Sequence, residues 1–397
     1  MQAMEYIAQD LPKAGDTVLV GLSGGVDSTL TALMLKNAGC KVIGVTMSLW
    51  DGTVIEKNKD SNRIRMKEAC FGPAEAENIR QCQEFCRQNG IEYHVVDVKP
   101  VYKEKVIEYF KAEYRSGRTP NPCVMCNQNV KFGAMLDAVS ALGISYDYFC
   151  TGHYARIVQP AEGVFGTGMR PFMISTATDS TKDQTYFIYR VNSDILAKVR
   201  FPLAALKKSE VIELAQKAKL KAADRKESQD FAGEEYKEAL FADKASVPGD
   251  IIDLDGYVLG RHKGIEHYTI GQRRGLGVAA AYPIYVHSID VKNNLVVLAK
   301  NEELNSRGLI ADDFVWPAGV EPKEELESLV KIRLASKPVP CKITRYIPNA
   351  DDITEYKGQP WKIIFAEEQR AVAPGQSAVL YKDSVIIGGG IISKVIK

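Results

Sequence analysis

The chain has 397 residues, of which 45% are hydrophobic and 25% charged, and its formal net charge at pH 7 is +1. This composition indicates a globular protein of two or three domains, because a single core rarely serves so long a chain. No apolar run is long enough to span a bilayer and the first residues lack a secretory pattern, so no membrane contact is expected. The eight cysteines are then expected to be reduced thiols of a cytoplasmic protein, not a disulfide framework.

The N-terminal part of the chain alternates β-branched apolar runs with helical patterns. This alternation predicts an α/β domain with a doubly wound parallel sheet over residues 1–200. Ligands of such domains bind at the carboxyl ends of the strands. The predicted strands are residues 17–20, 41–47, 92–97 and 146–150, and the clearest helical patterns are residues 74–89 and 103–116.

The pattern changes twice further along the chain. Residues 201–305 read first as helices and then as short alternating runs, which predict a helical segment followed by a small central β domain. The runs over residues 306–397 predict a C-terminal β-barrel. Nine basic residues and three acidic ones lie between Lys198 and Lys226. In a nearly neutral protein, this imbalance favours a surface for a polyanion whose binding weakens with salt.

Residues 21–28 form the most informative loop, Gly-Leu-Ser-Gly-Gly-Val-Asp-Ser, between a predicted strand and a helical pattern. Its glycines let the backbone approach an anion closely, and the helix that follows offers N–H groups and a positive dipole end. The loop lacks the ending of a Walker A motif. It resembles the PP-loop of ATP pyrophosphatases, which implies that Ser23, Gly24, Gly25 and Ser28 hold pyrophosphate and that Asp27 contacts Mg²⁺. An ordinary Gly-rich turn is the alternative.

A second string, residues 117–127, reads Gly-Arg-Thr-Pro-Asn-Pro-Cys-Val-Met-Cys-Asn. The prolines on either side of Asn121 hold the backbone extended, so the segment can present a thiol on a rigid loop. The pair Cys123 and Cys126 fits a metal half-site, a dithiol or a nucleophile with a helper. Three further strings, residues 150–156, 182–187 and 267–277, carry groups that suit phosphate or base contacts, with structural turns as the alternative.

Eight strings together resemble, in order and spacing, the bacterial tRNA 2-thiouridylase family (MnmA/TrmU) over nearly the whole chain. They are residues 21–28, 117–132, 151–156, 182–187, 201–214, 248–260, 268–277 and 370–381. The resemblance implies that ATP adenylates O2 of a tRNA uridine, at the wobble position, and that cysteine-borne sulfur then displaces AMP to leave 2-thiouridine. It also implies two partners: tRNA, and a sulfur donor that is a persulfide carrier, a cysteine desulfurase or sulfide.

The resemblance also assigns individual residues. Cys126 matches the family nucleophile, and Asp27 and Cys123 complete the expected catalytic set. Asn121, Pro122 and Cys123 are expected to face the target base. The expected ATP-site residues are Gly21, Leu22, Ser23, Gly24, Gly25, Val26, Asp27, Ser28, Met47 and Gly152, and the expected tRNA contacts are Lys182, Asp183, Gln184, Arg333 and Leu334.

Three positions depart from the family pattern. Members usually carry a second catalytic cysteine, which receives the persulfide, where this chain has Ala232. Cys123 stands in place of the usual aspartate, and Leu334 in place of the usual tyrosine. Two hypotheses restore sulfur transfer. In the first, Cys123 is the partner thiol of Cys126. In the second, Cys123, Cys126 and Cys150 ligate a [4Fe–4S] cluster whose fourth iron binds sulfide.

Two other classes of protein remain as alternatives. One is a PP-loop ligase that adenylates a small acid, and it predicts AMP formation without tRNA. The other is a paralogue that binds tRNA without thiolating it, which would explain Ala232. The intact loop at residues 21–28 argues against the second alternative, because a relic should lose its ATP loop first.

Overall fold

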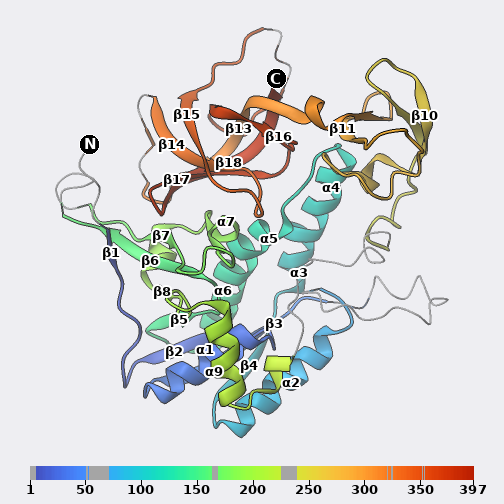
Figure 1. The fold of residues 1–397 in the computed structure, drawn as a ribbon. Coiled ribbons are helices and arrows are strands. Elements are labelled where there is room, and N and C mark those ends of the chain that lie inside the picture. The colour runs from blue at the N-terminus through green and yellow to red at the C-terminus, as the bar shows by residue number, and fades with distance from the viewer. Residues whose placement is uncertain are drawn as a thin grey trace.

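The computed structural model describes residues 6–50, 52, 71–162, 169–224, 239–319, 321–322, 325–350, 352 and 354–397. Within these residues the strands form a five-stranded, a four-stranded and a nine-stranded sheet. Figure 1 shows the five-stranded sheet and its helices below the two β units formed by the C-terminal half of the chain. No helix in the described part of the chain is both long and apolar enough to cross a membrane.

Five parallel strands form the sheet of the α/β domain, in the order β4-β3-β2-β5-β8. They are β2 (Thr17–Gly21), β3 (Lys41–Ser48), β4 (Glu92–Asp97), β5 (Tyr148–Cys150) and β8 (Val199–Arg200). The chain runs outward from β2 to β4 and then places β5 on the other side of β2, so the predicted doubly wound sheet is confirmed. Ligands bind such sheets where the strand order reverses, which is here between β2 and β5.

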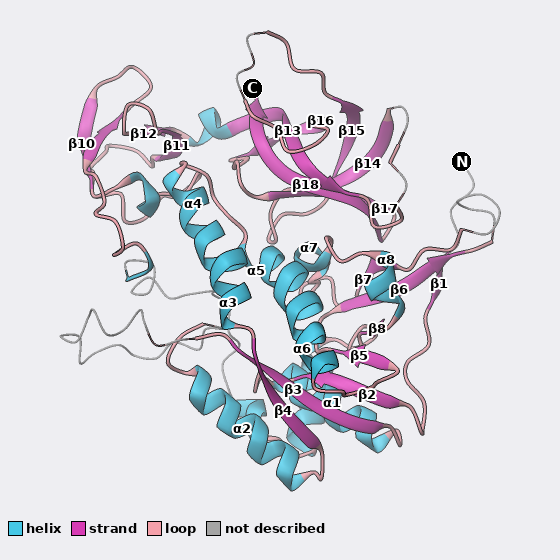
Figure 2. Cartoon of the chain, turned by 180° about the vertical axis from the view of Figure 1, so that it is seen from behind, coloured by secondary structure: helices cyan, strands magenta, loops and turns pink. Residues whose placement is uncertain are grey.

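Helices cover both faces of this sheet. They are α1 (Val26–Asn37), α2 (Glu75–Gln88), α3 (Lys99–Tyr102), α4 (Tyr109–Arg115), α5 (Pro122–Met125) and α6 (Met135–Ala141), with π-helical segments η2 (Lys103–Glu108) and η3 (Cys126–Ala134) between them. Strand side chains alternate between faces, so Val18, Val20 and Cys150 pack beneath α1 and α2. Leu19 and Phe149 pack on the opposite face, against the helices from α3 to α6. Figure 2 shows these helices standing between the sheet and the β units above it.

The remaining helices of the described residues are short. They are α7 (Thr185–Ile188), α8 (Ser193–Ala197) and α9 (Lys208–Lys217), with 3-10 turns η4 (Lys221–Asp224), η5 (Ile265–His267) and η6 (Asn301–Leu304). Helix α9 lies beside α1, where Leu30 and Val211 share one apolar cluster (Figure 1). This helix therefore packs with the α/β domain, whereas the sequence grouped it with the small β domain in residues 201–305.

The four-stranded sheet forms the small β domain that the sequence predicts. Its strands are β9 (Gly249–Ile252), β10 (Val258–His262), β11 (Tyr285–Asp290) and β12 (Leu295–Ala299), in the order β10-β9-β12-β11. Ile251, Val286 and Val296 are fully buried in its core. These strands therefore share one hydrophobic core, to which Ala371 and Ala373 from the chain between β16 and β17 also contribute.

The C-terminal strands close into the predicted β-barrel, in the order β18-β13-β16-β15-β14-β17 with β17 paired back to β18. They are β13 (Asn305–Val315), β14 (Leu326–Lys331), β15 (Val339–Arg345), β16 (Trp361–Arg370), β17 (Ser377–Lys382) and β18 (Val385–Ile396). Three strands of the α/β domain, β1 (Tyr6–Ala8), β6 (Ala155–Pro160) and β7 (Met173–Thr176), extend the same sheet. The pairing of Ser175 with Val385 joins the two domains.

Candidate active site

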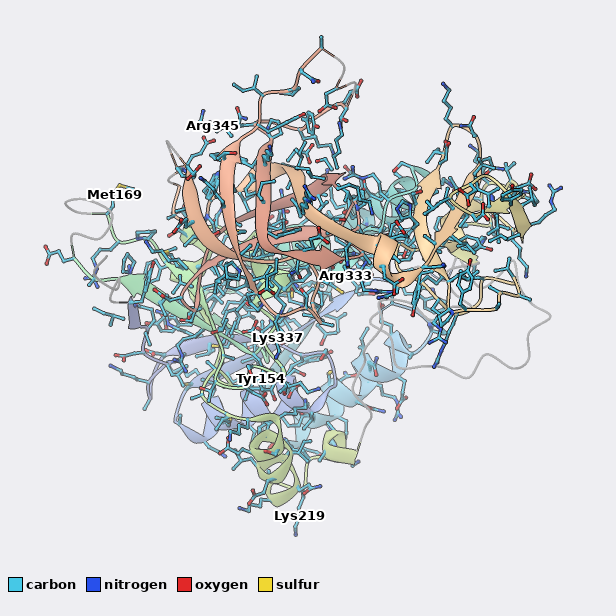
Figure 3. The ribbon with its side chains drawn as sticks, turned by 45° about the horizontal axis from the view of Figure 1, so that its top comes forward. Tyr154, Met169, Lys219, Arg333, Lys337 and Arg345 are labelled. Carbon is cyan, nitrogen blue, oxygen red and sulfur yellow. The ribbon has the colours of Figure 1, made fainter. Side chains whose placement is uncertain are left out.

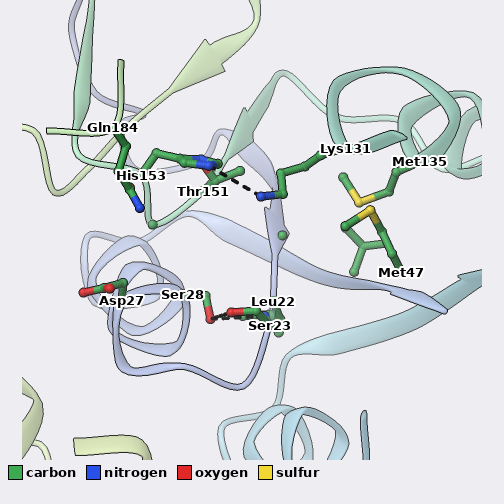
Figure 4. Close-up of a pocket in the computed structure, with 13 residues that line it drawn as sticks. Leu22, Ser23, Asp27, Ser28, Met47, Lys131, Met135, Thr151, His153 and Gln184 are labelled. Atoms are coloured by element: carbon green, nitrogen blue, oxygen red, sulfur yellow. Dashed lines mark hydrogen bonds between the residues drawn. The ribbon is translucent and has the colours of Figure 1, made fainter. Parts of the chain in front are cut away.

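A pocket lies at the carboxyl ends of β2 and β5, where the strand order reverses (Figure 4). The loop that follows β2 and the loop that follows β5 form two of its walls. Seven of the predicted ATP-site residues line it: Gly21, Leu22, Ser23, Asp27, Ser28, Met47 and Gly152. The structure adds Val45, Lys131, Met135, Thr151, His153 and Gln184. The pocket therefore collects groups from distant parts of the sequence at the position where sheets of this kind bind ligands.

The loop after β2 is folded tightly on itself. Ser23 N donates a hydrogen bond to Ser28 Oγ at 3.2 Å, and Ser28 Oγ donates to Gly25 O at 3.1 Å. Gly24 has a φ of +78°, a conformation that favours glycine. Helix α1 then begins at Val26 without a side-chain cap. A helix start of this kind offers its first N–H groups to an anion, which suits a phosphate.

Not all of the predicted loop residues line this pocket. Gly24 lines a different cavity, between α1 and α2. Gly25 is the N-cap of α1 and Val26 its first residue. These three residues therefore shape the loop, and the structure places none of them among those that line the pocket.

Gly152 lets the two loops approach each other. A Cβ at this position would lie 2.7 Å from the carbonyl carbon of Asp27 and 2.9 Å from Ser28 N. Real Cβ atoms do not approach backbone so closely, so only glycine fits here without a shift of one loop. The contact places Gly152 directly against residues 27 and 28 of the loop.

Asp27 is held by two side chains. Lys208 Nζ lies 2.7 Å from both carboxylate oxygens, and Tyr154 OH donates a hydrogen bond to Oδ1 at 3.0 Å. The carboxylate is of the ligand type that Mg²⁺ prefers, and it lies on the pocket wall. It is therefore suited to contact a metal that arrives with a nucleotide, although a lysine engages it in this structure.

Lys131 and His153 bring a cation and an imidazole to the opposite side of the pocket (Figure 4). Lys131 Nζ lies 3.5 Å from His153 Nε2, and Thr151 Oγ1 lies 2.7 Å from Nδ1. Burial, followed by the nearby Lys131 charge, lowers the pKa of His153 well below its ordinary value. The imidazole is therefore neutral at physiological pH, with Nε2 accepting from Lys131 and Nδ1–H donating to Thr151.

We expect His153 to make the protein less stable in mild acid. In the unfolded chain this histidine becomes protonated below its ordinary pKa of about 6.5, whereas the folded chain keeps it neutral. The free energy of unfolding therefore decreases as the pH falls below that value, by about 1.4 kcal/mol per pH unit. Denaturant unfolding at about pH 7 and about pH 5 measures the loss. His153→Gln should lose less free energy over the same interval, and equal losses would contradict the assignment.

The segment with Cys123 and Cys126 is helical. Asn121 caps α5, accepting a hydrogen bond from Val124 N at 3.4 Å, and Pro122 is the first helical residue. Both thiols are partly exposed, and their spacing of three residues places them on one helix face. Cys126 begins η3, the same continuous helical run that carries Lys131 to the pocket. The cysteine pair is thus connected to the pocket by one rigid element.

The structure does not assemble the three-cysteine iron–sulfur site. Cys150 is fully buried on the α1 and α2 face of the sheet, whereas Cys126 packs on the opposite face. Burial also raises the pKa of the Cys150 thiol. Among the described residues, no group of three or more histidine, cysteine or carboxylate side chains is placed to hold a metal. The seven cysteines that the structure describes are outside disulfide bonds.

Only part of the turn predicted to contact tRNA, residues 182–184, is exposed to solvent. Asp183 is buried and accepts hydrogen bonds from Ala177 N at 3.1 Å and Thr185 N at 3.3 Å. Burial raises the pKa of its carboxyl group. Its placement does not support the predicted tRNA contact, because the carboxylate holds the turn from inside. Lys182 and Gln184 remain partly exposed, and Gln184 lines the pocket and accepts from Tyr154 N at 3.0 Å.

Arg333 joins two domains. Its guanidinium donates to Ile270 O of the small β domain at 3.1 Å and to Ala371 O of the barrel. Figure 3 shows it between these two units. The predicted role of Arg333 as a tRNA contact is thus accompanied by a structural role that the sequence did not indicate. Leu334, its neighbour, is 41% exposed.

The basic residues 198–226 divide into two groups. Arg200 is buried and donates to Asp10 O at 2.9 Å, and Lys208 is paired with Asp27. The other described members are exposed and form the available cationic surface: Lys198, Lys207, Lys217, Lys219 and Lys221. Arg225, Lys226 and Ala232 lie outside the described residues.

The loop before the cysteines lies where the three domains meet. Gly117 touches the small β domain, because a Cβ there would lie 2.7 Å from Val291. Thr119 N donates to Pro374 O of the barrel at 2.7 Å. Gln376 Nε2 donates to the carbonyl of Thr119 at 3.0 Å and to that of Pro120 at 3.1 Å. These contacts were not expected from the sequence, and they fix the cysteine loop from both β domains.

Three family models match consecutive parts of the chain. Residues 16–232 match the tRNA methyl transferase HUP domain, residues 239–300 the tRNA methyl transferase PRC-barrel domain, and residues 306–392 the aminomethyltransferase beta-barrel domain. The first alone covers more than half of the chain. These boundaries follow the α/β domain, the small β domain and the barrel of the structure.

Curated relatives match over nearly the full length. The chain is 39% identical to the tRNA-specific 2-thiouridylase MnmA of Endomicrobium trichonymphae over 94% of its own length and 98% of the relative's. It is 38% identical to tRNA-specific 2-thiouridylase MnmA 1 of Syntrophus aciditrophicus (strain SB), over 96% and 93%. It is 37% identical to the corresponding protein of Roseiflexus castenholzii, over 95% and 99%.

Proposed function

The chain belongs to the tRNA-specific 2-thiouridylase (MnmA) family, and we propose that it uses ATP to convert a tRNA uridine to 2-thiouridine. The observation that carries the proposal is the pocket at the ends of β2 and β5, which unites the PP-loop with Gly152, Lys131 and Gln184. The cysteine helix continues directly into this pocket wall. The ATP pocket and the cysteine pair are therefore linked by one helical run, which supports activation of an oxygen and delivery of sulfur at neighbouring positions.

The first step activates the uridine. The tRNA O2 attacks the α-phosphorus of ATP, the bond to the bridging oxygen breaks, and pyrophosphate leaves. The loop of residues 21–28 and the start of α1 hold the phosphates through backbone N–H groups. Lys131 supplies a cation on the opposite wall. Asp27 would hold a Mg²⁺ ion bound with ATP, and that ion would neutralise phosphate charge.

The second step delivers sulfur from Cys126. With a persulfide on Cys126, the terminal sulfur attacks uridine C2 and AMP leaves with the former O2. The Cys123 thiolate then attacks Cys126 Sγ, which breaks the remaining S–S bond and releases 2-thiouridine. The sulfane sulfur gains two electrons and the two thiols become a disulfide, which a thiol reductant must reset. Three residues of helix rise by roughly 4.5 Å, so the two Cα atoms lie within disulfide range.

The proposed function is tested with purified protein, ATP, Mg²⁺, an unmodified tRNA transcript and a cysteine desulfurase with cysteine. We expect AMP and pyrophosphate release that depends on tRNA, and 2-thiouridine in the nucleoside digest by mass spectrometry. AMP formation without tRNA would indicate a ligase for another acceptor. Tight tRNA binding with no AMP formation would indicate a silent paralogue.

Two cysteine variants separate the hypotheses for sulfur delivery. Because Cys123 lies on the Cys126 helix face and Cys150 on the other side of the sheet, Cys123→Ser should lose about 10²-fold or more in thiolation rate, whereas Cys150→Ser should retain it. Both variants should continue to release pyrophosphate. Loss of thiolation in both variants, together with bound iron in the wild-type protein, would contradict the dithiol hypothesis and support the iron–sulfur cluster.

A further inference from the structure

We propose that Lys208 is a positioning residue of the ATP site, which neutralises and orients the Asp27 carboxylate from behind the pocket. This inference rests on the proposed function for the identity of the nucleotide. It assigns to Lys208 a role different from the surface contact that its place in a basic segment suggests. The ligand that benefits is the polyanionic triphosphate of ATP.

Lys208 and Asp27 form an ion pair that is largely shielded from solvent. Lys208 Nζ lies 2.7 Å from each carboxylate oxygen, and the two side chains are only 13% and 24% exposed. The ammonium also lies 5.7 Å from the centre of the Tyr154 ring, whose OH donates to the same carboxylate. Asp27 lines the pocket, and Lys208 is not among the described residues that do. The lysine therefore acts on the carboxylate and not on a ligand.

The fold fixes Lys208 in this place. It is the first residue of α9, which is held against α1 by the apolar cluster that contains Leu30 and Val211. The backbone N–H of Lys208 donates to Asp179 Oδ2 at 2.9 Å, which anchors the start of the helix. Exposed ion pairs between mobile side chains contribute little to stability, but this pair is pre-organised by packing and by a backbone hydrogen bond.

The electrostatic consequence concerns ATP binding. The triphosphate carries several negative charges, and an unpaired carboxylate on the wall would repel it. In a partly desolvated site this repulsion is stronger than in water. With Lys208 in place the pair is neutral, and the positive end of α1 and Lys131 determine the local potential. Removing only the lysine leaves the Asp27 carboxylate without a counter-charge in a partly desolvated site, which makes its repulsion of the triphosphate stronger.

The experiment is a double-mutant cycle on ATP affinity, measured by equilibrium dialysis of labelled ATP in excess EDTA. The chelator removes metal effects, and the assay needs neither tRNA nor turnover. We expect Lys208→Met to weaken ATP binding by about tenfold. In the Asp27→Asn background, the same change should alter the dissociation constant by less than about twofold, because no charge remains to be paired.

Two controls separate pairing from other roles. Lys208→Arg keeps the cation and should keep wild-type affinity. Lys207→Met removes the exposed neighbouring lysine and should leave ATP binding unchanged. Thermal melting identifies unfolded variants, and Lys208→Gln replaces Lys208→Met if the latter does not fold.

The outcomes are distinct. Unchanged affinity in Lys208→Met overturns the inference. An equal loss in the Asp27→Asn background also overturns it, because Lys208 would then act without Asp27. Wild-type protein that binds no ATP, either in EDTA or with Mg²⁺ restored, overturns the proposed function itself, whereas normal wild-type binding with no effect of Lys208→Met leaves that function standing.

Discussion

Replacing Cys126 with serine is expected to lower the rate of 2-thiouridine formation by about 10³-fold or more, while pyrophosphate release continues. Serine preserves the size and hydrogen bonding of the side chain, but a hydroxyl cannot carry sulfane sulfur. Cys126 begins η3 and is not among the residues that line the ATP pocket, so the activation step keeps its groups. Pyrophosphate release and nucleoside mass spectrometry measure the two steps separately.

The matched control for this variant is Cys341→Ser. Cys341 is buried in the barrel, where its sulfur lies 3.3 Å from Ser328 Oγ, so a hydroxyl has a hydrogen-bond partner there. We expect this variant to thiolate tRNA at the wild-type rate. If Cys126→Ser retains thiolation, Cys126 does not carry the sulfur and another route must deliver it.

The sequence predicted the fold well where the signal is local. The predicted strand over residues 92–97 coincides with β4, and the one over residues 17–20 differs from β2 by a single residue. Strand β18 is harder to recognise in the sequence because it contains Gly388, Gly389 and Gly390, which weaken a strand pattern. In the structure these glycines lie against the rings of Trp316, Tyr189 and Phe314, where a Cβ has no room. Only tertiary packing explains this choice of residue.

At the candidate site, too, the sequence predicts local features but not contacts between distant segments. The loop at residues 21–28 is one continuous string, so its place at a strand–helix junction was predictable. Asp183 and Arg333 match tRNA-contact positions of the family by residue type. The structure shows that Asp183 holds its own turn through Ala177 N and Thr185 N, and that the carbonyl partners of Arg333 lie far away in the sequence. Lys131 was not singled out, because nothing in its local sequence distinguishes a pocket lysine from a surface one. The pairing of Lys208 with Asp27 likewise appears only when α9 packs on α1.

Replacing Gly152 with alanine is expected to weaken ATP binding by about 10²-fold, since a displacement of roughly 1 Å in a binding site has effects of this size. The backbone of Gly152 is outside the left-handed region, so alanine meets no conformational penalty there. The new Cβ would lie 2.7 Å from the Asp27 carbonyl carbon and 2.9 Å from Ser28 N. Both contacts are to backbone, so no flexible side chain can move aside and the two loops must separate.

Equilibrium dialysis of ATP measures this loss, and tRNA affinity is the control, because the exposed lysines between residues 198 and 221 are unchanged. Overpacking of this kind also costs about 1–3 kcal/mol of stability, so a melting curve must show that the variant is folded at the assay temperature. If a folded Gly152→Ala protein binds ATP with a dissociation constant within about twofold of the wild-type value, Gly152 is not part of the ATP site. Such a result would mean that the loop after β5 does not need to approach the PP-loop for the nucleotide to bind. The close contact of Gly152 with Asp27 and Ser28 would then be a feature of packing, and the ligand would have to lie on the β3 side of the PP-loop, towards Val45 and Met47.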